Sequence, residues 1–313
     1  MSNLEKIPFE KITPKKMPLF EPLASGHRAC QGCGEMVAMR LALKALGEDT
    51  IVVSATGCME VVTSYYPQTA WNVPWLHVAF ENAAAVGSGV EAARKALFRK
   101  GRLKSNTTKI AIIGGDGGTS DIGFQALSGA MERKHNVLYI CFDNEAYMNT
   151  GIQRSSATPE CAWTTTSPLG ECSTGKAGPK KDLVAIMADH GIPYVATASP
   201  AYHIDLMNKV RKAAAVSGPA FVHVLSPCPT GWRMSPAQSV KIAKLAVETK
   251  IYPLYEVIEG RYVLSRKPSK WKPVEAYLKS QGRFKHLTED QIREVQAQAD
   301  GKYARLEWLS KGD

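Results

Sequence analysis

The stretch KIAIIGGDGG, residues 109–118, decides the fold of this chain. Its first half is a short apolar run rich in isoleucine, and its second half places Asp116 between two pairs of glycines. Apolar runs of this length are typical of buried strands in parallel sheets. Glycines after such a strand let the backbone approach a ligand closely, and their amides can face an anion. The sequence therefore predicts a strand at 109–115 that ends at a ligand site.

Four further runs of the same kind alternate with amphipathic stretches. The apolar runs are TIVVSA (50–55), NVLYICF (136–142), PYVATA (193–198) and PAFVHVL (219–225). The stretches with helical periodicity are residues 35–46, 81–97, 182–190 and 203–216. This alternation predicts an α/β fold with a doubly wound, mostly parallel sheet. Ligands of such sheets bind beyond the carboxyl ends of the strands.

We expect one large domain with an extension at each end. Residues 26–260 carry the alternating pattern, residues 1–25 form an N-terminal extension, and residues 261–313 form a charged, partly helical C-terminal extension that contacts another subunit. Residues 146–181 are rich in Gly, Ser, Thr and Pro. A loop of this length in a compact domain is usually functional or disordered.

The formal net charge of +10 has two explanations. Lys and Arg are scattered and no basic run is interleaved with aromatic residues, so a solvated basic surface comes first and no nucleic-acid partner is predicted. An acidic electron carrier is the partner that the charge favours next. The N-terminus does not resemble a signal peptide, and no stretch has the roughly 18 apolar residues of a membrane helix. We therefore expect a cytoplasmic protein without a membrane contact.

Four of the seven cysteines form a candidate metal cage. Cys30 and Cys33 form a C-x-x-C pair, Cys58 follows the run at 50–55, and Cys228 lies between two prolines after the run at 219–225. Thiolates are soft ligands, and two single, distant cysteines beside one pair suit an iron–sulfur cluster. Structural zinc, which usually takes two such pairs, and four metal-free thiols are the alternatives.

The other three cysteines have simpler interpretations. Cys141 lies inside an apolar strand and is expected to be a core thiol. Cys161 and Cys172 flank the segment WTTTSPLGE in the long loop. Two unrelated thiols are favoured there over a reversible disulfide.

A second set of ligands suits Mg²⁺ and a diphosphate. Asp116 offers a carboxylate oxygen, and Asn144, which follows the next strand, offers an amide oxygen. The carbonyl of Ala146 can supply a third oxygen as the chain turns. Mg²⁺ prefers such oxygens and shares its sites with substrate phosphates. G-D-G followed by Asn after one β unit is the pattern of thiamine-diphosphate enzymes, and a glycine-rich turn with an unrelated Asn is the alternative.

A third motif is expected to be structural. GSGVEA at 87–92 matches the dinucleotide fingerprint G-x-G-x-x-A. The residues before it read as a helix, whereas the fingerprint requires a strand there. Small residues that permit close helix packing explain it better.

With these residues, the chain resembles the β subunits of multi-subunit pyruvate:ferredoxin oxidoreductases, within the 2-oxoacid:ferredoxin oxidoreductase family. The resemblance extends from about residue 26 to GRFKHL at 282–287. Its markers are GHRACQGCGE, SATGCMEVV, HVAFENAAA, IGGDGGTSDIG, DNEAYMNTGIQRSSATP and CPTGW.

The resemblance implies a role for each matching position. Cys30, Cys33, Cys58 and Cys228 would hold a proximal [4Fe–4S] cluster, and Asp116, Asn144 and the Ala146 carbonyl would bind Mg²⁺. Thiamine diphosphate would contact Glu35, Cys58, Asp116, Gly117, Gly118, Thr119, Asn144, Glu145, Ala146, Tyr147, Met148 and Asn149. Asn149 would act as the catalytic residue that reaches toward the reacting carbon, and Tyr147 and Met148 would shape the thiazolium environment.

The implied reaction is oxidative decarboxylation of a 2-oxoacid, with electrons passing through the cluster to ferredoxin. Pyruvate is the favoured substrate, with coenzyme A as acyl acceptor, while oxalate, which needs no coenzyme A, and branched-chain 2-oxoacids are alternatives. The resemblance also implies alpha-, gamma- and delta-type partner subunits, with the carboxylate that activates the cofactor on the alpha chain. Two other classes compete: a non-redox, zinc-containing thiamine-dependent lyase or transferase, and a cluster-bearing assembly protein without catalysis.

Overall fold

An eight-stranded sheet forms the centre of the molecule. The computed structural model describes residues 8–311. Across the sheet the strands follow the order β10-β9-β7-β8-β4-β3-β1-β2. The strands are β1 (Thr50–Ala55), β2 (Trp75–Val78), β3 (Lys109–Gly115), β4 (Leu138–Asp143), β7 (Tyr194–Ala198), β8 (Ala220–Leu225), β9 (Tyr255–Ile258) and β10 (Arg261–Leu264). All neighbours from β2 to β7 pair in parallel, whereas β9 and β10 are antiparallel.

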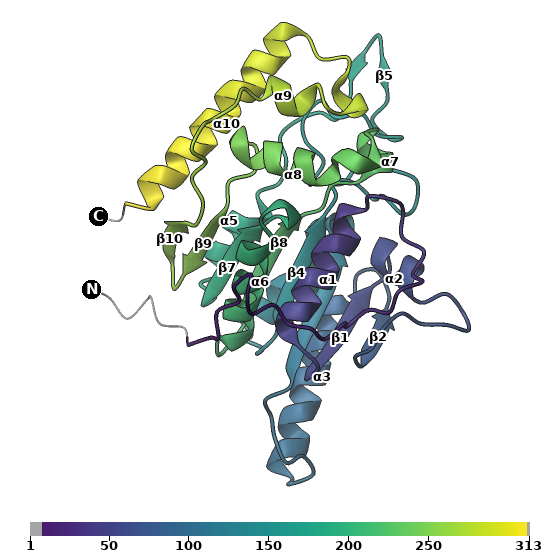
Figure 1. The fold of residues 1–313 in the computed structure, drawn as a ribbon, viewed down its shortest axis with the longest axis vertical. Coiled ribbons are helices and arrows are strands. Elements are labelled where there is room, and N and C mark those ends of the chain that lie inside the picture. The colour runs from purple at the N-terminus through teal and green to yellow at the C-terminus, as the bar shows by residue number, and fades with distance from the viewer. Residues whose placement is uncertain (1–7, 312–313) are drawn as a thin grey trace.

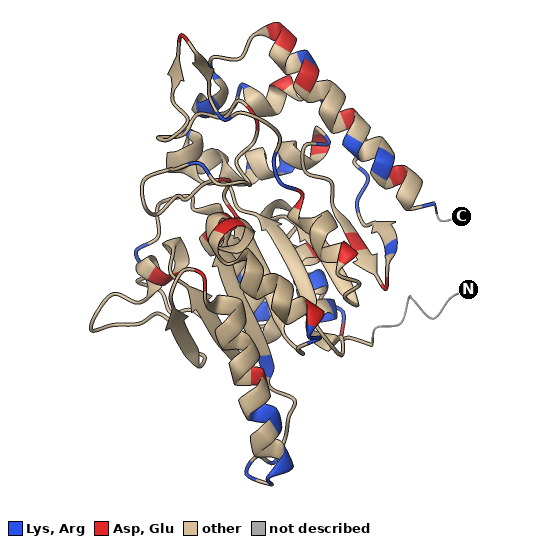
Figure 2. Ribbon diagram, turned by 180° about the vertical axis from the view of Figure 1, so that it is seen from behind, with Lys and Arg blue, Asp and Glu red and all other residues tan. Residues whose placement is uncertain are grey.

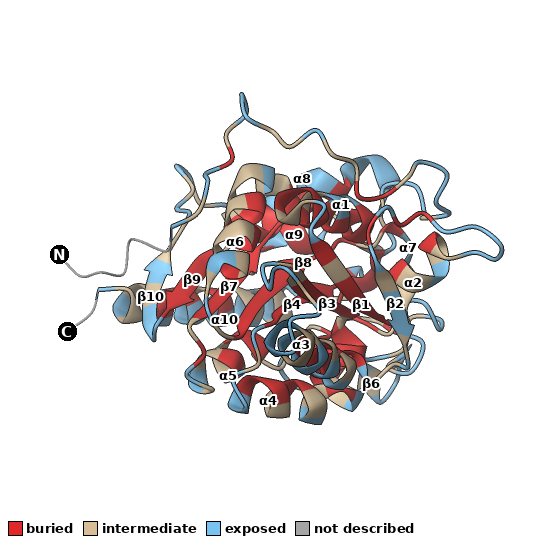
Figure 3. Cartoon of the chain, turned by 90° about the horizontal axis from the view of Figure 1, so that it is seen from below, coloured by how far each residue is buried: buried red, intermediate tan, exposed pale blue. Residues whose placement is uncertain are grey.

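Helices cover both faces of this sheet. One face packs against α1 (Gly34–Leu46) and α6 (His203–Ala215), and the other against α3 (Ala83–Arg99), α4 (Phe124–Glu132) and α5 (Leu183–Asp189). Figure 3 shows the buried strands between these two helical layers. Successive side chains of a strand point to opposite faces, so Ile113 joins the first core and Ile112 the second. The predicted doubly wound, mostly parallel α/β fold is confirmed.

A third core lies above the carboxyl ends of the strands. It is built by α8 (Ser239–Glu248), α9 (Glu275–Leu278) and the long α10 (Glu289–Leu309), with Trp232 fully buried at its centre. Figure 1 shows these helices at the end of the molecule where the carboxyl ends of the strands lie. The small hairpin β5 (Leu169–Gly170) and β6 (Ser173–Thr174) lies at the same end.

All five strands that the apolar runs predict are present, but β2, β9 and β10 were not predicted. Strands β9 and β10 carry charged residues and form an antiparallel hairpin. Its turn is Glu259–Gly260, both with positive φ, and Glu–Gly is a weaker turn signal than Asn–Gly. The expected domain boundary at 260/261 falls inside this hairpin, so residues 261–264 belong to the sheet.

The N-terminal segment packs onto the domain. Ile12 is fully buried, and its backbone amide and carbonyl both bond to the side chain of Asn208 on α6. Glu21 accepts from Arg40 and Lys44 of α1. The first seven residues of the predicted N-terminal extension lie outside the described part of the chain.

Basic residues are spread over most of the surface, with a concentration at one end. There α3 and the loop after it project beyond the sheet and carry Arg94, Lys95, Arg99, Lys100, Arg102 and Lys104 (Figure 2). This end is opposite the carboxyl ends of the strands. Among the described helices, none is both long enough and apolar enough to cross a bilayer.

Candidate functional site

Four chemically distinctive segments meet at the carboxyl ends of neighbouring strands. In the order β8-β4-β3-β1, each strand is followed by one of them: Cys228 after β8, Asn144 after β4, Asp116 after β3 and Cys58 after β1. The strands are parallel and adjacent, so these residues share one rim of the sheet, as ligand sites of doubly wound folds do.

A cavity at this rim collects most of the residues that the resemblance assigned to thiamine diphosphate. Those that line it are Glu35, Cys58, Gly117, Gly118, Asn144, Ala146, Tyr147, Met148 and Asn149. The ring of Tyr147 stacks on Phe80 with 5.7 Å between centroids, and its hydroxyl donates to the Gly117 carbonyl. A Cβ on Gly117 would lie 2.5 Å from that ring, so the close approach requires glycine. We call this space the cofactor cavity.

Two oxygen atoms at this rim of the sheet are buried without a hydrogen-bond partner among the described residues: Oδ1 of Asn144, which lines the cavity, and Oδ1 of Asp116, whose neighbours Gly115 and Gly117 line it. The other atoms of both side chains are engaged. Oδ2 of Asp116 accepts from the Ser155 hydroxyl at 2.5 Å, and Nδ2 of Asn144 donates to Glu35 at 2.9 Å. Burying an oxygen acceptor without a partner is costly, so these two atoms mark a place for a cation.

Burial dominates the electrostatics of the carboxylates around these atoms. Burial, and then the charge of Asp143, raises the pKa of Asp116 well above its ordinary value. Burial also raises the pKa of Glu35, to about 7, against the opposing hydrogen bond from Asn144. A bound divalent cation would favour the charged carboxylates instead.

Two predicted cofactor contacts have side chains that point elsewhere. The Thr119 hydroxyl donates to the Gly115 carbonyl and lies 3.0 Å from the Tyr139 hydroxyl, so only its backbone amide remains for a ligand. The Glu145 carboxylate bonds to Lys180 and Arg283 behind the cofactor cavity. Neither side chain lines that cavity.

Three of the four candidate cluster cysteines stand at the start of a helix. Cys33 caps α1 and accepts from the Met36 amide, Cys228 caps α7 (Pro229–Trp232) and accepts from the Gly231 amide, and Cys58 is the first residue of α2 (Cys58–Thr63). Free amides at helix N-termini favour negatively charged ligands such as thiolates. Cys30 is exposed.

Backbone contacts join the cysteine segments. The Gly34 amide donates to the Pro227 carbonyl at 2.9 Å, and a Cβ on Gly34 would lie 2.7 Å from the Pro227 ring. Burial, and then the charge of Glu35, raises the pKa of Cys58, and the other three cysteines of the candidate cage act in the same direction. Within residues 8–311, however, no three or more His, Cys, Asp or Glu side chains gather tightly enough for a single metal ion.

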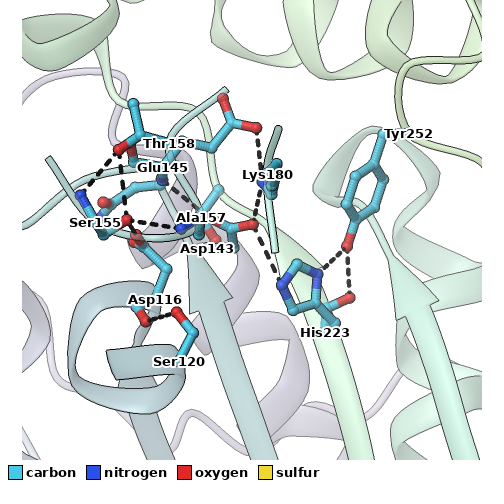
Figure 4. A network of polar contacts seen from close by, with 12 residues as sticks. Asp116, Ser120, Asp143, Glu145, Ser155, Ala157, Thr158, Lys180, His223 and Tyr252 are labelled. Carbon is cyan, nitrogen blue, oxygen red and sulfur yellow. Dashed lines mark hydrogen bonds and ion pairs between the residues drawn. The ribbon is translucent and has the colours of Figure 1, made fainter. Parts of the chain in front are cut away.

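The remaining cysteines lie as the sequence predicts. Cys141 is fully buried in β4, and Cys161 and Cys172 are free thiols in the long loop. That loop, residues 146–181, folds back over the site and brings Ser155, Thr158 and Lys180 to it (Figure 4).

A buried network behind Asp116 was not found by sequence reasoning. Lys180 lies 2.5 Å from Asp143 and 2.8 Å from Glu145, and His223 lies 3.2 Å from Asp143 (Figure 4). Burial alone would raise the pKa of Asp143, but the charges and hydrogen bonds of Lys180 and His223 together outweigh it, and the net shift is downward. Lone polar residues in loops and strands carry no spacing signal, so only the tertiary structure reveals this network.

Comparison with protein families supports the same site. The model of the thiamine pyrophosphate enzyme C-terminal, TPP-binding domain matches residues 55–224, which begin at the end of β1 and include β3, β4 and all but the last residue of β8. A solved 2-oxoglutarate:ferredoxin oxidoreductase from Magnetococcus marinus has a similar fold, with a TM-score of 0.55 over 73% of this chain and 82% of that one. At 22% identity this similarity concerns the fold alone.

Curated relatives match over almost the full length. The chain is 57% identical to the pyruvate synthase subunit PorB of Methanocaldococcus jannaschii, over 92% of this chain and 97% of that protein. It is 49% identical to the Thermotoga maritima PorB, over 91% and 90%. The ketoisovalerate oxidoreductase subunit VorB of Pyrococcus abyssi is 46% identical, over 94% and 95%. The chain therefore belongs to the PorB family of 2-oxoacid oxidoreductase subunits, within the thiamine pyrophosphate enzymes.

Proposed function

We propose that this chain is the subunit of a pyruvate:ferredoxin oxidoreductase that binds thiamine diphosphate, Mg²⁺ and a [4Fe–4S] cluster. The observation that carries the proposal is that two unpartnered buried oxygens, of Asp116 and Asn144, lie at the same rim of the sheet as the hydrogen-bonded segments that carry the four cysteines. The relatives named pyruvate synthase subunits support the substrate.

Mg²⁺ and the diphosphate fit the residues present. Oδ1 of Asp116 and Oδ1 of Asn144 are hard oxygen donors with no other partner among the described residues. Gly117 and Gly118 line the cavity beside them, so backbone amides can reach phosphate oxygens. Ala146 lines it too and would supply its carbonyl.

The cysteines fit a cluster better than zinc. A zinc ion draws its four sulfurs to about 2.3 Å from one point. Structural zinc sites usually provide these sulfurs as two C-x-x-C pairs, whereas this chain has one pair and two single, distant cysteines, and the thiolates of a [4Fe–4S] cluster bind different irons around a larger body. Soft thiolates at the N-termini of α1, α2 and α7 suit this iron–sulfur ligation.

The two centres would be neighbours. Cys58 belongs to the cysteine group and also lines the cofactor cavity. Met148 lines the same cavity, and a Cβ on Gly231 in the turn after Cys228 would lie 2.2 Å from the Met148 sulfur. Short separation is what electron transfer from the cofactor site to the cluster requires.

The chemistry divides between the cofactor and this chain. Thiamine diphosphate, when bound, supplies the carbon centre that attacks the 2-oxo group and takes up the electron pair released with carbon dioxide. Asp116 and Asn144 would anchor the diphosphate end of the cofactor through Mg²⁺, and Tyr147 and Met148 would line the site around its reacting end. Asn149, which is exposed at the cavity mouth, would orient the substrate there.

The substrate and the partners follow from the same family. Pyruvate with coenzyme A is preferred over a branched-chain 2-oxoacid because identity to the two PorB relatives, 57% and 49%, exceeds the 46% identity to VorB. Oxalate, without coenzyme A, would be distinguished by a substrate panel on the complete complex. The partners would be alpha-, gamma- and delta-type subunits, and ferredoxin would accept the electrons.

Two reciprocal substitutions test the proposal in the purified complex. Asp116→Ala should weaken thiamine diphosphate binding at least 100-fold, because it removes a metal ligand, while the iron content stays unchanged. Cys228→Ser should remove the iron and the visible absorption that bleaches on reduction, while thiamine diphosphate still binds. Cys172→Ser, at an exposed cysteine of the long loop, is the matched control and should change neither.

The competing functions give different results. A zinc-containing thiamine-dependent lyase or transferase would be colourless and hold zinc in place of iron. A cluster-bearing assembly protein would contain iron but bind no thiamine diphosphate in the wild-type complex. Either result would overturn the proposal.

A further inference from the structure

Two predicted magnesium ligands, Asn144 and Ala146, follow β4, and the turn between them has an unfavourable backbone conformation. Glu145, which separates Asn144 from Ala146, has φ of 70°, in the left-handed region that favours glycine. A non-glycine residue there costs roughly 1 kcal/mol or more and persists only where its surroundings hold it. This conformation lets the Asn144 side chain and Ala146 face the same cavity.

Side chains of Asp143 and Thr158 form hydrogen bonds with the backbone amide and carbonyl of Glu145 and so hold the turn on both sides. The Glu145 amide donates to Oδ1 of Asp143 at 2.9 Å. Its carbonyl accepts from the Thr158 hydroxyl at 2.8 Å, and the Thr158 hydroxyl also accepts from the Ser155 amide (Figure 4). Ser155 in turn donates to Asp116, so the same loop touches both metal-binding segments.

The Glu145 side chain is fixed by two cations. One oxygen accepts from Lys180 at 2.8 Å and the other from Arg283 at 2.5 Å. Glu145 and Arg283 are 3% and 2% exposed, so this ion pair is shielded from solvent. Glu145 lines a second cavity of about 320 Å³, together with Lys180, His223 and Tyr252, and does not line the cofactor cavity.

Arg283 also contacts the other side of the turn. Its guanidinium lies 4.1 Å from the ring centroid of the buried Trp232. The Trp232 indole nitrogen donates to the Asn144 carbonyl at 2.8 Å. One side chain from the C-terminal segment therefore supports both Asn144 and Glu145.

The charges of this network are balanced. Two carboxylates, Asp143 and Glu145, face two permanent cations, Lys180 and Arg283. Loss of Arg283 would leave both carboxylates to share Lys180 and the neighbouring His223. Removing one partner of a buried pair leaves an uncompensated charge, which drives rearrangement.

We propose that Arg283, with Lys180, is a positioning residue that holds the Asn144–Glu145–Ala146 turn in its cofactor-binding conformation. The inference rests on the proposed function, because it assigns the turn to Mg²⁺ and thiamine diphosphate. It also gives the C-terminal segment a role in cofactor binding, in addition to the expected subunit contact.

The experiment measures the dissociation constant of Mg²⁺–thiamine diphosphate by titration calorimetry with the cofactor-depleted complex. Arg283→Met should weaken binding 10- to 100-fold, the usual effect of losing a residue that orients a metal ligand. Arg283→Lys keeps the charge that faces Glu145 but loses the planar contact with Trp232, so it should weaken binding clearly less than Arg283→Met does. Lys209→Met is the matched control. Lys209 is an equally buried cation that pairs with Asp205 on α6, and its loss should change binding less than two-fold.

The outcomes separate the inference from the function on which it rests. If the wild-type complex binds no thiamine diphosphate, the proposed function fails. If the wild type binds but Arg283→Met binds equally well, or if the Met and Lys variants weaken binding equally, the positioning role is wrong. Circular dichroism of each depleted complex monitors folding. Should Arg283→Met not fold, Arg283→Gln takes its place with the same expected loss.

Discussion

At the residue scale, the choice of asparagine at position 144 has a physical reason. A carboxylate would be a stronger magnesium ligand, but Nδ2 of Asn144 must donate to the buried Glu35. An aspartate would place a second carboxylate against Glu35, whose pKa burial already raises to about 7. The side-chain nitrogen of Asn144 therefore donates to the Glu35 carboxylate, while the side-chain oxygen of Asn144 stays available for a ligand.

Asn144→Asp should destabilise the cofactor-depleted protein in a pH-dependent way. Because Glu35 has a higher pKa folded than unfolded, the folded state binds more protons between pH 4.5 and about 7. The free energy of unfolding therefore falls as pH rises through that window. The free energy of unfolding of the variant should be lower than that of the wild type by about 2 kcal/mol at pH 8, and by much less at pH 5.

Urea denaturation at both pH values measures this difference. Asn136→Asp is the control, since Oδ1 of Asn136 accepts from the Gly218 amide and an aspartate oxygen can replace it. A pH-independent loss at Asn144, equal to that at Asn136, would contradict the role of the Glu35 contact.

At the element scale, the close packing of α3 on β3 depends on one glycine. Gly87 faces the sheet, and a Cβ there would lie 2.3 Å from the side chain of Ile112. Gly89, two residues later on the same helix, would meet nothing within 4 Å. The motif GSGVEA thus serves helix packing, as the sequence predicted.

Gly87→Ala and Gly89→Ala should have opposite effects on stability. The first overpacks the core beside Ile112 and should lower the free energy of unfolding by about 1–3 kcal/mol. The second replaces glycine in a helix interior and should raise it by about 0.5–1 kcal/mol. Chemical denaturation measures both, and a stabilising effect of Gly87→Ala would show that α3 packs less closely than described.

At the scale of the whole molecule, the cofactor cavity offers few carboxylate side chains for catalysis. Among the described side chains that line the cofactor cavity, Glu35 is the single carboxylate, and it is engaged by Asn144. Asn149 and Thr150 at the mouth are exposed, as is Cys30. The carboxylate that activates thiamine diphosphate would therefore come from a partner subunit that covers this mouth.

The isolated chain should accordingly show no pyruvate oxidation, even when supplied with thiamine diphosphate, Mg²⁺ and reconstituted iron. Adding the purified partner subunits should restore reduction of ferredoxin, followed spectroscopically with coenzyme A present. The separate partner subunits form the control. Turnover by the isolated chain would show that the activating group lies within this polypeptide.

Much of the fold was predictable because its signals are local. Apolar runs such as residues 109–115 and 219–225 mark buried parallel strands by composition alone. Strands β9 and β10, the last two at one side of the sheet, were missed because they mix charged and apolar residues. Their place in the sheet depends on the pairing of β9 with β7, which no local sequence pattern predicts.

The sequence by itself determined the strand–helix alternation, the glycine-flanked Asp116, the asparagine after the next strand and the cysteine spacings, since each is a pattern of residue types along the chain. Only the tertiary structure decided that Glu145 points away from the cofactor cavity and that Arg283, 138 residues further on, holds it. The reason is physical: a buried charge pairs with whichever opposite charge the packing brings within reach, at whatever sequence separation.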